Sequence, residues 1–132
     1  MQCSNALDFQ DSEVSSAELE DNRFVVKFSA GRVCRVKGAR GPGNEYGFFQ
    51  ELQLTIHHAS IIEKESGCVG RISQGVLRVA GATSELVPIP YEADVNVELE
   101  FAFANGAMCK VAGRRITLEP TGEARVMEWL KC

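Results

Sequence analysis

The chain has 132 residues, of which 45% are hydrophobic and 24% are charged, and its formal net charge at pH 7 is −4. That length fits a single domain over residues 1–132, large enough to bury a core without disulfides or a metal. An acidic chain without a basic stripe argues against nucleic-acid binding, because phosphate neutralisation supplies most of that affinity.

Location is predicted from apolar runs and cysteines. The longest apolar run is a few residues, whereas a helix that spans a membrane needs roughly 20, and the chain starts without the pattern of a signal peptide. The five cysteines are odd in number, and their spacing includes no CxxC pair, which favours reduced thiols. We expect a cytoplasmic protein with no membrane partner and no cofactor, in which Cys34, Cys68 and Cys109 are small apolar strand residues.

The N-terminal third reads as short strands separated by turns. Residues 1–7 carry no periodic pattern and are expected to be disordered. Val14–Leu19 is predicted as a first strand, and Phe24–Ala30 alternates apolar and polar residues as a strand with one buried face does. Gly31 is predicted to start a return into a third strand, Val33–Lys37.

The middle of the chain contains the clearest loop, Gly38–Asn44, in which three glycines and a proline disfavour helix and strand alike. Phe48–His58 then predicts a long strand, one face of which carries Leu52, Leu54, Ile56 and His58. A second loop, Glu63–Gly67, is expected to lead into a strand at Cys68–Ser73.

Proline and glycine positions divide the next segment. Gln74–Gly75 is predicted to turn into a strand at Val76–Ala80. The segment Leu86–Tyr91 is extended, but neither Pro88 nor Pro90 can donate a hydrogen bond to a neighbouring strand. We therefore expect this segment at a sheet edge or in a crossing loop.

The best-specified element is the alternating run from Val95 to Phe103. Asn105-Gly106 follows, the strongest short-range signal of a hairpin with a type I′ turn, and Met108–Val111 is predicted to return beside the first strand. A last strand is expected at Ile116–Leu118. After it, residues 122–130 fit either a short helix capped by Thr121 or an extended segment.

Together these elements predict an all-β fold, an antiparallel β-sandwich or partly open barrel of about 8–10 short strands. A short C-terminal helix is optional in that fold. The side chains expected to face inward are bulky, which indicates a filled core and not a ligand cavity: Phe24, Phe28, Leu54, Phe101 and Phe103.

Histidines and cysteines offer a weak catalytic pattern. His57 and His58 are neighbours on a predicted strand, so they point to opposite faces and do not chelate one ion. One hypothesis keeps His58 facing inward beside Cys34, Cys68 or Cys109. The simpler interpretation makes His58 a residue at the end of a strand. No catalytic residue and no metal ligand is predicted.

Charged residues suggest a surface for a protein partner or for self-association. Asp8–Asp21 holds six acidic residues and no basic one, and a basic cluster from Arg32 to Arg40 is expected to meet this acidic stretch or an acidic partner. The loop at Gly38–Gly47 lacks the pattern of a phosphate-binding loop. The candidate interaction surface comprises Arg32, Arg35, Tyr46, Phe49 and His57.

Several fragments resemble a family of small uncharacterised bacterial β-rich proteins, some of which look like immunity proteins that neutralise a toxin. The fragments are Leu7–Ser12, Ile72–Leu77, Leu86–Pro90, Leu99–Gly106 and Gly122–Arg125 followed by Glu128. They are motifs of turns and core strands, and the first departs from the family pattern at Gln10, where His is common.

Three functional classes stay open at this stage. A non-enzymatic protein-interaction module, such as an immunity or accessory protein, agrees best with the acidic charge and the absence of a catalytic motif. A small-ligand-binding β-barrel is the first alternative. An enzyme with a site that contains Cys and His is the second.

Overall fold

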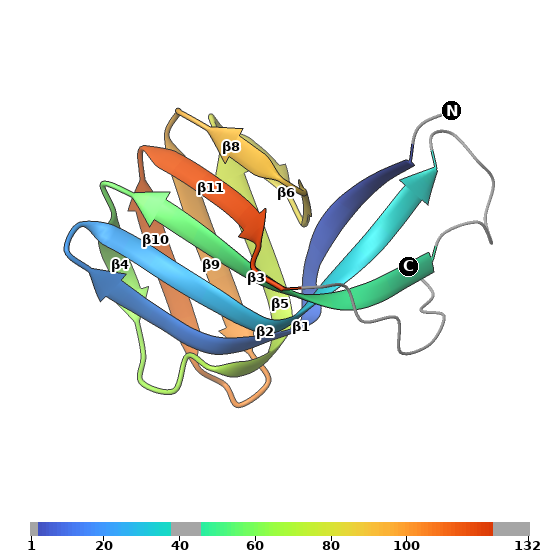
Figure 1. The fold of residues 1–132 in the computed structure, drawn as a ribbon. Coiled ribbons are helices and arrows are strands. Elements are labelled where there is room, and N and C mark those ends of the chain that lie inside the picture. Colours follow the sequence, from blue (N-terminus) through green and yellow to red (C-terminus); the bar gives the residue numbers. More distant parts are fainter. Residues whose placement is uncertain (1–2, 38–45, 123–132) are drawn as a thin grey trace.

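The computed structural model describes residues 3–37 and 46–122, and within these ranges every regular element is a β-strand (Figure 1). No helix in this part of the chain is long and apolar enough to cross a membrane. The strands are β1 (Cys3–Glu20), β2 (Arg23–Lys37), β3 (Tyr46–His57), β4 (Ser60–Lys64), β5 (Gly70–Val79), β6 (Ala82–Ser84), β7 (Leu86–Pro88), β8 (Tyr91–Ala93), β9 (Val97–Phe103), β10 (Met108–Gly113) and β11 (Arg115–Pro120).

All strands belong to one antiparallel sheet in the order β4-β10-β9-β5-β1-β2-β3-β11-β8, to which β6 adds at β5 and β7 at β1. The sheet is strongly curved but does not close into a barrel, so that its two halves face each other across the core (Figure 1). The predicted all-β fold is confirmed, in the form of a partly open barrel. The predicted loop at Gly38–Asn44 and the C-terminal helix or extended segment lie outside the described residues, except for Gly122.

The core is filled by large side chains from both halves of the curved sheet. The bulky residues expected to face inward are all buried, and Phe9 joins them. The ring of Phe101 lies at the centre, with edge-to-face contacts to Phe9, Phe28 and Phe103 at centroid distances of 5.1, 6.3 and 6.0 Å. Edge-to-face pairs of this kind are favourable beyond the area that they bury.

Three long strands, β1, β2 and β3, extend beyond the body of the sheet as a separate ribbon (Figure 1). The start of this ribbon was expected to be disordered, yet β1 begins at Cys3, which pairs in register with Lys37 of β2. Leu7 and Val33 pack there with no exposed surface. The pairing explains the order, because β2 lies along one edge of this segment and β7 along the other at residues 6–8.

Two glycines that the sequence predicts as turns lie inside strands instead. Gly31 is part of a bulge in β2, where the register with β3 shifts between Phe28 and Gly31. A Cβ at position 31 would lie 2.5 Å from Leu52 Cδ1, so this residue is a glycine because another strand packs against it. The predicted return at Gly31 is therefore wrong, and β2 is one strand of 15 residues.

Gly75 has the same role in β5. A Cβ there would lie 2.6 Å from the Cβ of Phe9 and 3.0 Å from Cδ1 of Phe101. The predicted turn at Gln74-Gly75 is wrong, because β5 continues through it with a bulge between Ile72 and Gln74. The missing side chain gives the two central phenylalanines their place in the core.

Edge strands account for the remaining differences. The exposed edge strand β4 was not predicted: its last two residues fall in the predicted loop Glu63–Gly67, and its first three were assigned to no element. The proline-bearing segment does lie at an edge: β7 pairs with residues 6–8 of β1 alone, and β8 pairs with β11. Both prolines therefore avoid positions where two neighbours would require an N–H.

The hairpin between β9 and β10 is confirmed, with a different turn. Gly106 has a φ of +95°, whereas Asn105 is not among the residues with positive φ. The N–H of Gly106 donates to the carbonyl of Phe103 and the N–H of Phe103 to that of Ala107, each at 2.9 Å. This is the longer hairpin connection that ends on a left-handed glycine, not the two-residue type I′ turn.

Replacing Gly75 by Ala is expected to lower the free energy of unfolding by about 1–3 kcal/mol, because the methyl group overpacks Phe9 and Phe101. Chemical denaturation of the two proteins measures the loss. The exposed neighbour serves as a control: Gln74→Ala should change stability by less than about 0.5 kcal/mol. A Gly75→Ala variant as stable as the control would restore the turn interpretation.

Replacing Gly106 by Val is expected to destabilise the fold by about 1–3 kcal/mol, because a β-branched residue is strained at positive φ. No atom lies within 4 Å of a Cβ at this position, so the loss is conformational and not steric. Gly106→Asn is the matched control and should lose clearly less, since Asn tolerates the left-handed region. Equal melting temperatures for all three proteins would contradict the assigned turn.

Candidate functional site

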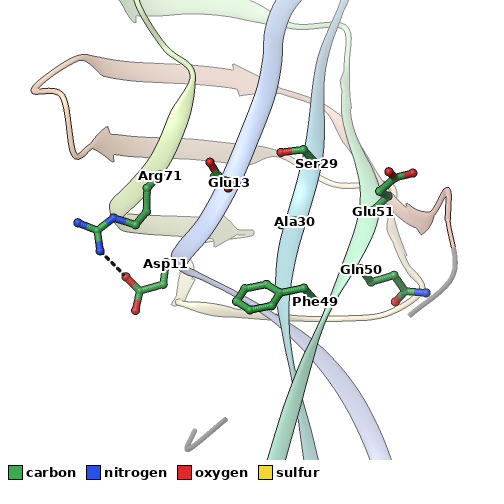
Figure 2. A pocket seen from close by; sticks show the side chains of 8 residues that line it. All are labelled: Asp11, Glu13, Ser29, Ala30, Phe49, Gln50, Glu51 and Arg71. Atoms are coloured by element: carbon green, nitrogen blue, oxygen red, sulfur yellow. Dashed lines mark hydrogen bonds and ion pairs between the residues drawn. The ribbon is translucent and has the colours of Figure 1, made fainter. Parts of the chain in front are cut away.

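An open cleft of about 570 Å³ lies where the ribbon of β1, β2 and β3 leaves the body of the sheet (Figure 2). Its walls carry three carboxylates, one guanidinium, one aromatic ring and one amide. The lining residues are Asp11 and Glu13 of β1, Ser29 and Ala30 of β2, Phe49, Gln50 and Glu51 of β3, and Arg71 of β5. We call this the bend cleft.

An irregularity shared by β1 and β2 shapes the bend cleft. The register between the two strands shifts between Asp8 and Glu13, and Asp11 has a φ of +70°. Ser12 is fully buried in this irregular stretch. Its hydroxyl donates to the carbonyl of Asp8 at 2.7 Å and accepts from the N–H of Arg32 at 2.8 Å, so that it bridges the two strands where their ladder is interrupted.

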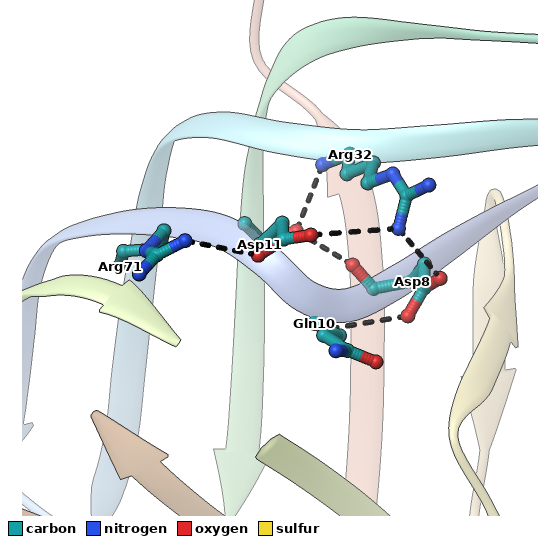
Figure 3. Close-up of polar contacts among 6 residues, drawn as sticks. Asp8, Gln10, Asp11, Arg32 and Arg71 are labelled. Atoms are coloured by element: carbon teal, nitrogen blue, oxygen red, sulfur yellow. Dashed lines mark hydrogen bonds and ion pairs between the residues drawn. The ribbon is translucent and has the colours of Figure 1, made fainter. Parts of the chain in front are cut away.

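A chain of ion pairs runs along one side of the bend cleft (Figure 3). The guanidinium of Arg32 lies 3.3 Å from Oδ2 of Asp8 and 3.9 Å from Oδ2 of Asp11. The guanidinium of Arg71 lies 3.4 Å from Oδ1 of Asp11. Asp11 thus holds two cations from different strands, and its side chain is fixed at the edge of the cleft.

Asp8 also stabilises this irregular stretch of β1. Its Oδ1 accepts the N–H of Gln10 at 3.1 Å, a local bond typical of Asp at a bend. Partial burial is the largest influence on the Asp8 carboxyl and raises its pKa, while the Gln10 N–H and the Arg32 guanidinium act in the opposite direction. The guanidinium of Arg32 therefore mainly offsets the free-energy cost of partly burying the Asp8 carboxylate.

The sequence-predicted surface is brought together only in part. Arg32 and Phe49 are direct neighbours across β2 and β3 and lie at the bend. As expected, Arg32 meets the acidic stretch of its own chain, at Asp8 and Asp11. Arg35 pairs with Tyr46 further along the ribbon, but the side chains of these two residues lie outside the described part of the structure.

His57 does not belong to the bend cleft, because it occupies the opposite end of β3. There its neighbours in register are Arg23 of β2 and Arg115 of β11, and its Nε2 lies 3.4 Å from Oγ1 of Thr117. Partial burial, followed by the charges of Arg115 and Arg23, lowers the pKa of His57. A neutral imidazole among cations is a different environment from the acidic cleft.

The Cys–His hypothesis receives no geometric support within the described residues. His58 leaves the strand with a φ of +52° and is exposed, so it does not face inward as the alternation predicts. No cluster of three or more His, Cys, Asp or Glu side chains that could hold a metal ion occurs in this part of the chain. The interpretation of His58 as a residue at the end of a strand agrees with its position.

The three cysteines whose side chains the structure describes divide into two kinds. Cys68 and Cys109 are buried free thiols as expected, but Cys68 lies in the loop before β5 and not in the predicted strand Cys68–Ser73. Cys34 is disulfide-bonded, so the expectation of a reduced thiol there is wrong. Residue spacing alone does not show this, because a disulfide depends on which strands are neighbours.

Sequence reasoning missed most of the cleft's other walls. Arg71 reaches Asp11 because β5 begins beside β1 at Gly70, a pairing of segments almost 60 positions apart. Gln50 and Glu51 line the cleft because β2 bulges opposite them. No pattern in the neighbouring sequence predicts the pairing of β5 with β1 or the bulge in β2.

Comparisons with protein-family models, with curated proteins and with solved structures found no match. The geometry of the described residues is therefore the basis for a functional proposal.

Replacing Ser12 by Ala is expected to lower the free energy of unfolding by about 1–3 kcal/mol, because the change removes two hydrogen bonds from a site closed to water. Ser15→Ala is the matched control on the same strand, since its exposed hydroxyl donates to the carbonyl of Lys27 at 3.1 Å. That variant should lose less than about 0.5 kcal/mol. Similar losses for both variants would show that Ser12 is not a bridge on which the bend depends.

Proposed function

We propose that this protein is a non-enzymatic interaction module whose bend cleft receives a basic side chain of a protein partner. One observation carries the proposal: an open cavity of about 570 Å³ whose walls combine the carboxylates of Asp11, Glu13 and Glu51 with the ring of Phe49. Among the described lining residues, Arg71 supplies the opposing charge.

Electrostatics favours a cationic occupant. The chain as a whole is acidic, and a cleft in which carboxylates outnumber cations has a negative potential at its opening. Asp11 is already engaged by Arg32 and Arg71, so an added cation would approach the cleft on the side of Glu13. Complementary charge of this kind raises the association rate and discriminates against acidic partners.

The chemistry of the walls favours arginine over a simple ammonium. A guanidinium is planar, donates in a fork that matches a carboxylate, and stacks on an aromatic face. Phe49 offers that face, and its neighbour Gln50 offers an amide. The Nε2 of Gln50 donates to the carbonyl of Gly122 at 3.0 Å, which fixes the orientation of this amide.

The resemblance to proteins that look like immunity proteins fits the same class. A toxin that acts on nucleic acid presents a basic surface, because it must neutralise phosphates, and an acidic cleft complements such a surface. The immunity role and the bacterial origin are both part of the proposal.

A small cationic ligand is the second candidate, since the cleft volume lies within the range of roughly 300–1,000 Å³ typical of small-molecule sites. The alternative of a ligand inside a β-barrel has less support, because large side chains fill the interior.

The proposed cytoplasmic location has one observation against it. Cys34 is disulfide-bonded, and disulfides persist mainly in oxidising compartments.

A hexa-arginine peptide tests the proposal as a probe of the cleft. We expect its addition at low ionic strength to shift the amide resonances of Asp11, Phe49 and Gln50 in NMR spectra. Glu13→Gln should weaken binding about threefold, as loss of one exposed carboxylate does. Phe49→Ala should weaken it about fivefold through loss of a stacking face.

Glu18→Gln is the matched control, because Glu18 lies on the same strand outside the cleft and the change in charge is identical. If Glu18→Gln weakens binding as much as Glu13→Gln, the peptide responds to net charge alone and the proposal is wrong. Arginine amide separates the two candidates: affinity equal to that of the peptide would favour the small ligand.

A further inference from the structure

Two free thiols lie together beside the edge strand β4, and neither of them lines the bend cleft. Cys109 is on β10, opposite Lys64 of the edge strand β4. Cys68 is in the loop that joins β4 to β5, where its thiol donates to the carbonyl of Glu65 at 3.1 Å and lies 3.5 Å from that of Met108. Cys68 is therefore placed beside the residue that precedes Cys109.

The two residues are neighbours, because the thiol of Cys68 lies 3.5 Å from the carbonyl of Met108, the residue before Cys109. Both are almost completely buried, at 3% exposure for Cys68 and 1% for Cys109. Burial, followed by the neighbouring Cys68, raises the pKa of Cys109 to about 12. In the closed fold the pair is thus protected from reagents in solution.

Few contacts hold β4 and the loop that follows it, which lie next to this pair of thiols. The strand β4 is exposed along its whole length, and β10 is its one neighbour among the described strands. The loop after β4 is held by Asn105, whose Nδ2 donates to the carbonyl of Gly67 at 2.8 Å and to that of Val69 at 3.4 Å. Edge strands with few buried contacts open locally at a small fraction of the free energy of global unfolding.

We propose that Cys68 and Cys109 form a latent disulfide site, which a low-molecular-weight disulfide oxidises when β4 and its loop open. The thiolate of Cys68 attacks one sulfur of the oxidant, which forms a mixed disulfide and releases one thiol. The thiolate of Cys109 then attacks the sulfur of Cys68 and releases the second thiol. In total, two cysteine thiols and one disulfide give one cysteine disulfide and two small thiols.

The order of attack follows from position. Cys68 is in a surface loop between the exposed residues Gly67 and Val69, whereas Cys109 lies within a strand between two neighbours. Opening of the loop alone frees Cys68, and Cys109 then resolves the mixed disulfide from the adjacent position. The product joins the loop to β10 and keeps the edge strand in place.

Oxidised glutathione is the probe, added in excess to the full-length protein as purified, with its Cys34 disulfide intact. We expect peptide mapping without reduction to identify a Cys68–Cys109 crosslink and the melting temperature to rise by about 5 °C or more. Cys109→Ala should accumulate glutathione on Cys68, whereas Cys68→Ala should leave Cys109 largely unmodified. Failure of the wild-type protein to form the crosslink would overturn the proposal.

A second experiment tests the opening step. Asn105→Ala removes two of the bonds that hold the loop and should accelerate crosslinking about tenfold, the change expected for a loss of roughly 1.4 kcal/mol. The exposed Asn96 serves as a control, and Asn96→Ala should leave the rate unchanged. Equal rates for wild type and Asn105→Ala would show that oxidation does not require the loop to open, and the proposed route would be wrong.

Discussion

The structure depends on how β1 changes its neighbours halfway along its length. On one side β1 pairs with β2, while on the other it pairs first with β7 and then with β5. Where the partner changes, the ladder with β2 is interrupted between Asp8 and Glu13, and the buried hydroxyl of Ser12 bridges β1 to β2 there. The interruption lets Phe9 enter the core and turns the acidic residues that follow outward. The filled core and the bend cleft therefore have a common origin in one irregular stretch of four residues.

The alternation of apolar residues predicts the class of fold, the hairpin at Asn105-Gly106 and the inward set of phenylalanines. It fails at Gly31 and Gly75, because a glycine within a strand pattern fits a turn as well as a close approach of two chains. Only the residue that packs against the glycine distinguishes a turn from a close approach. Here those residues are Leu52 for Gly31 and Phe9 for Gly75, and both are distant in the sequence. The same limit applies to the site. Arg32 and the acidic stretch can be linked by charge, whereas Arg71 joins them only through the pairing of β5 with β1.

Charge is distributed unevenly over the sheet. Arg78 pairs with Glu98 and Glu100 on the half formed by β5 and β9, and Lys110 of β10 also reaches Glu98. At the start of β11, Arg115 pairs with Glu92 of the edge strand β8. These cross-strand pairs balance acidic residues locally and leave them little capacity to attract a partner. The bend cleft differs because its carboxylates surround an open volume, and that difference distinguishes a candidate site from ordinary surface charge.

The place of β11 in the sheet has a consequence for synthesis of the chain on the ribosome. One edge of β3 is completed by β2 at once, but the other is completed only by β11, near the end of the sequence. At roughly 5–20 residues per second, a nascent chain carries β3 with an open edge for several seconds. An apolar strand in that state pairs readily with other chains. During this interval the nascent chain is prone to aggregation through the open edge of β3. A chaperone that shields β3 would prevent that aggregation.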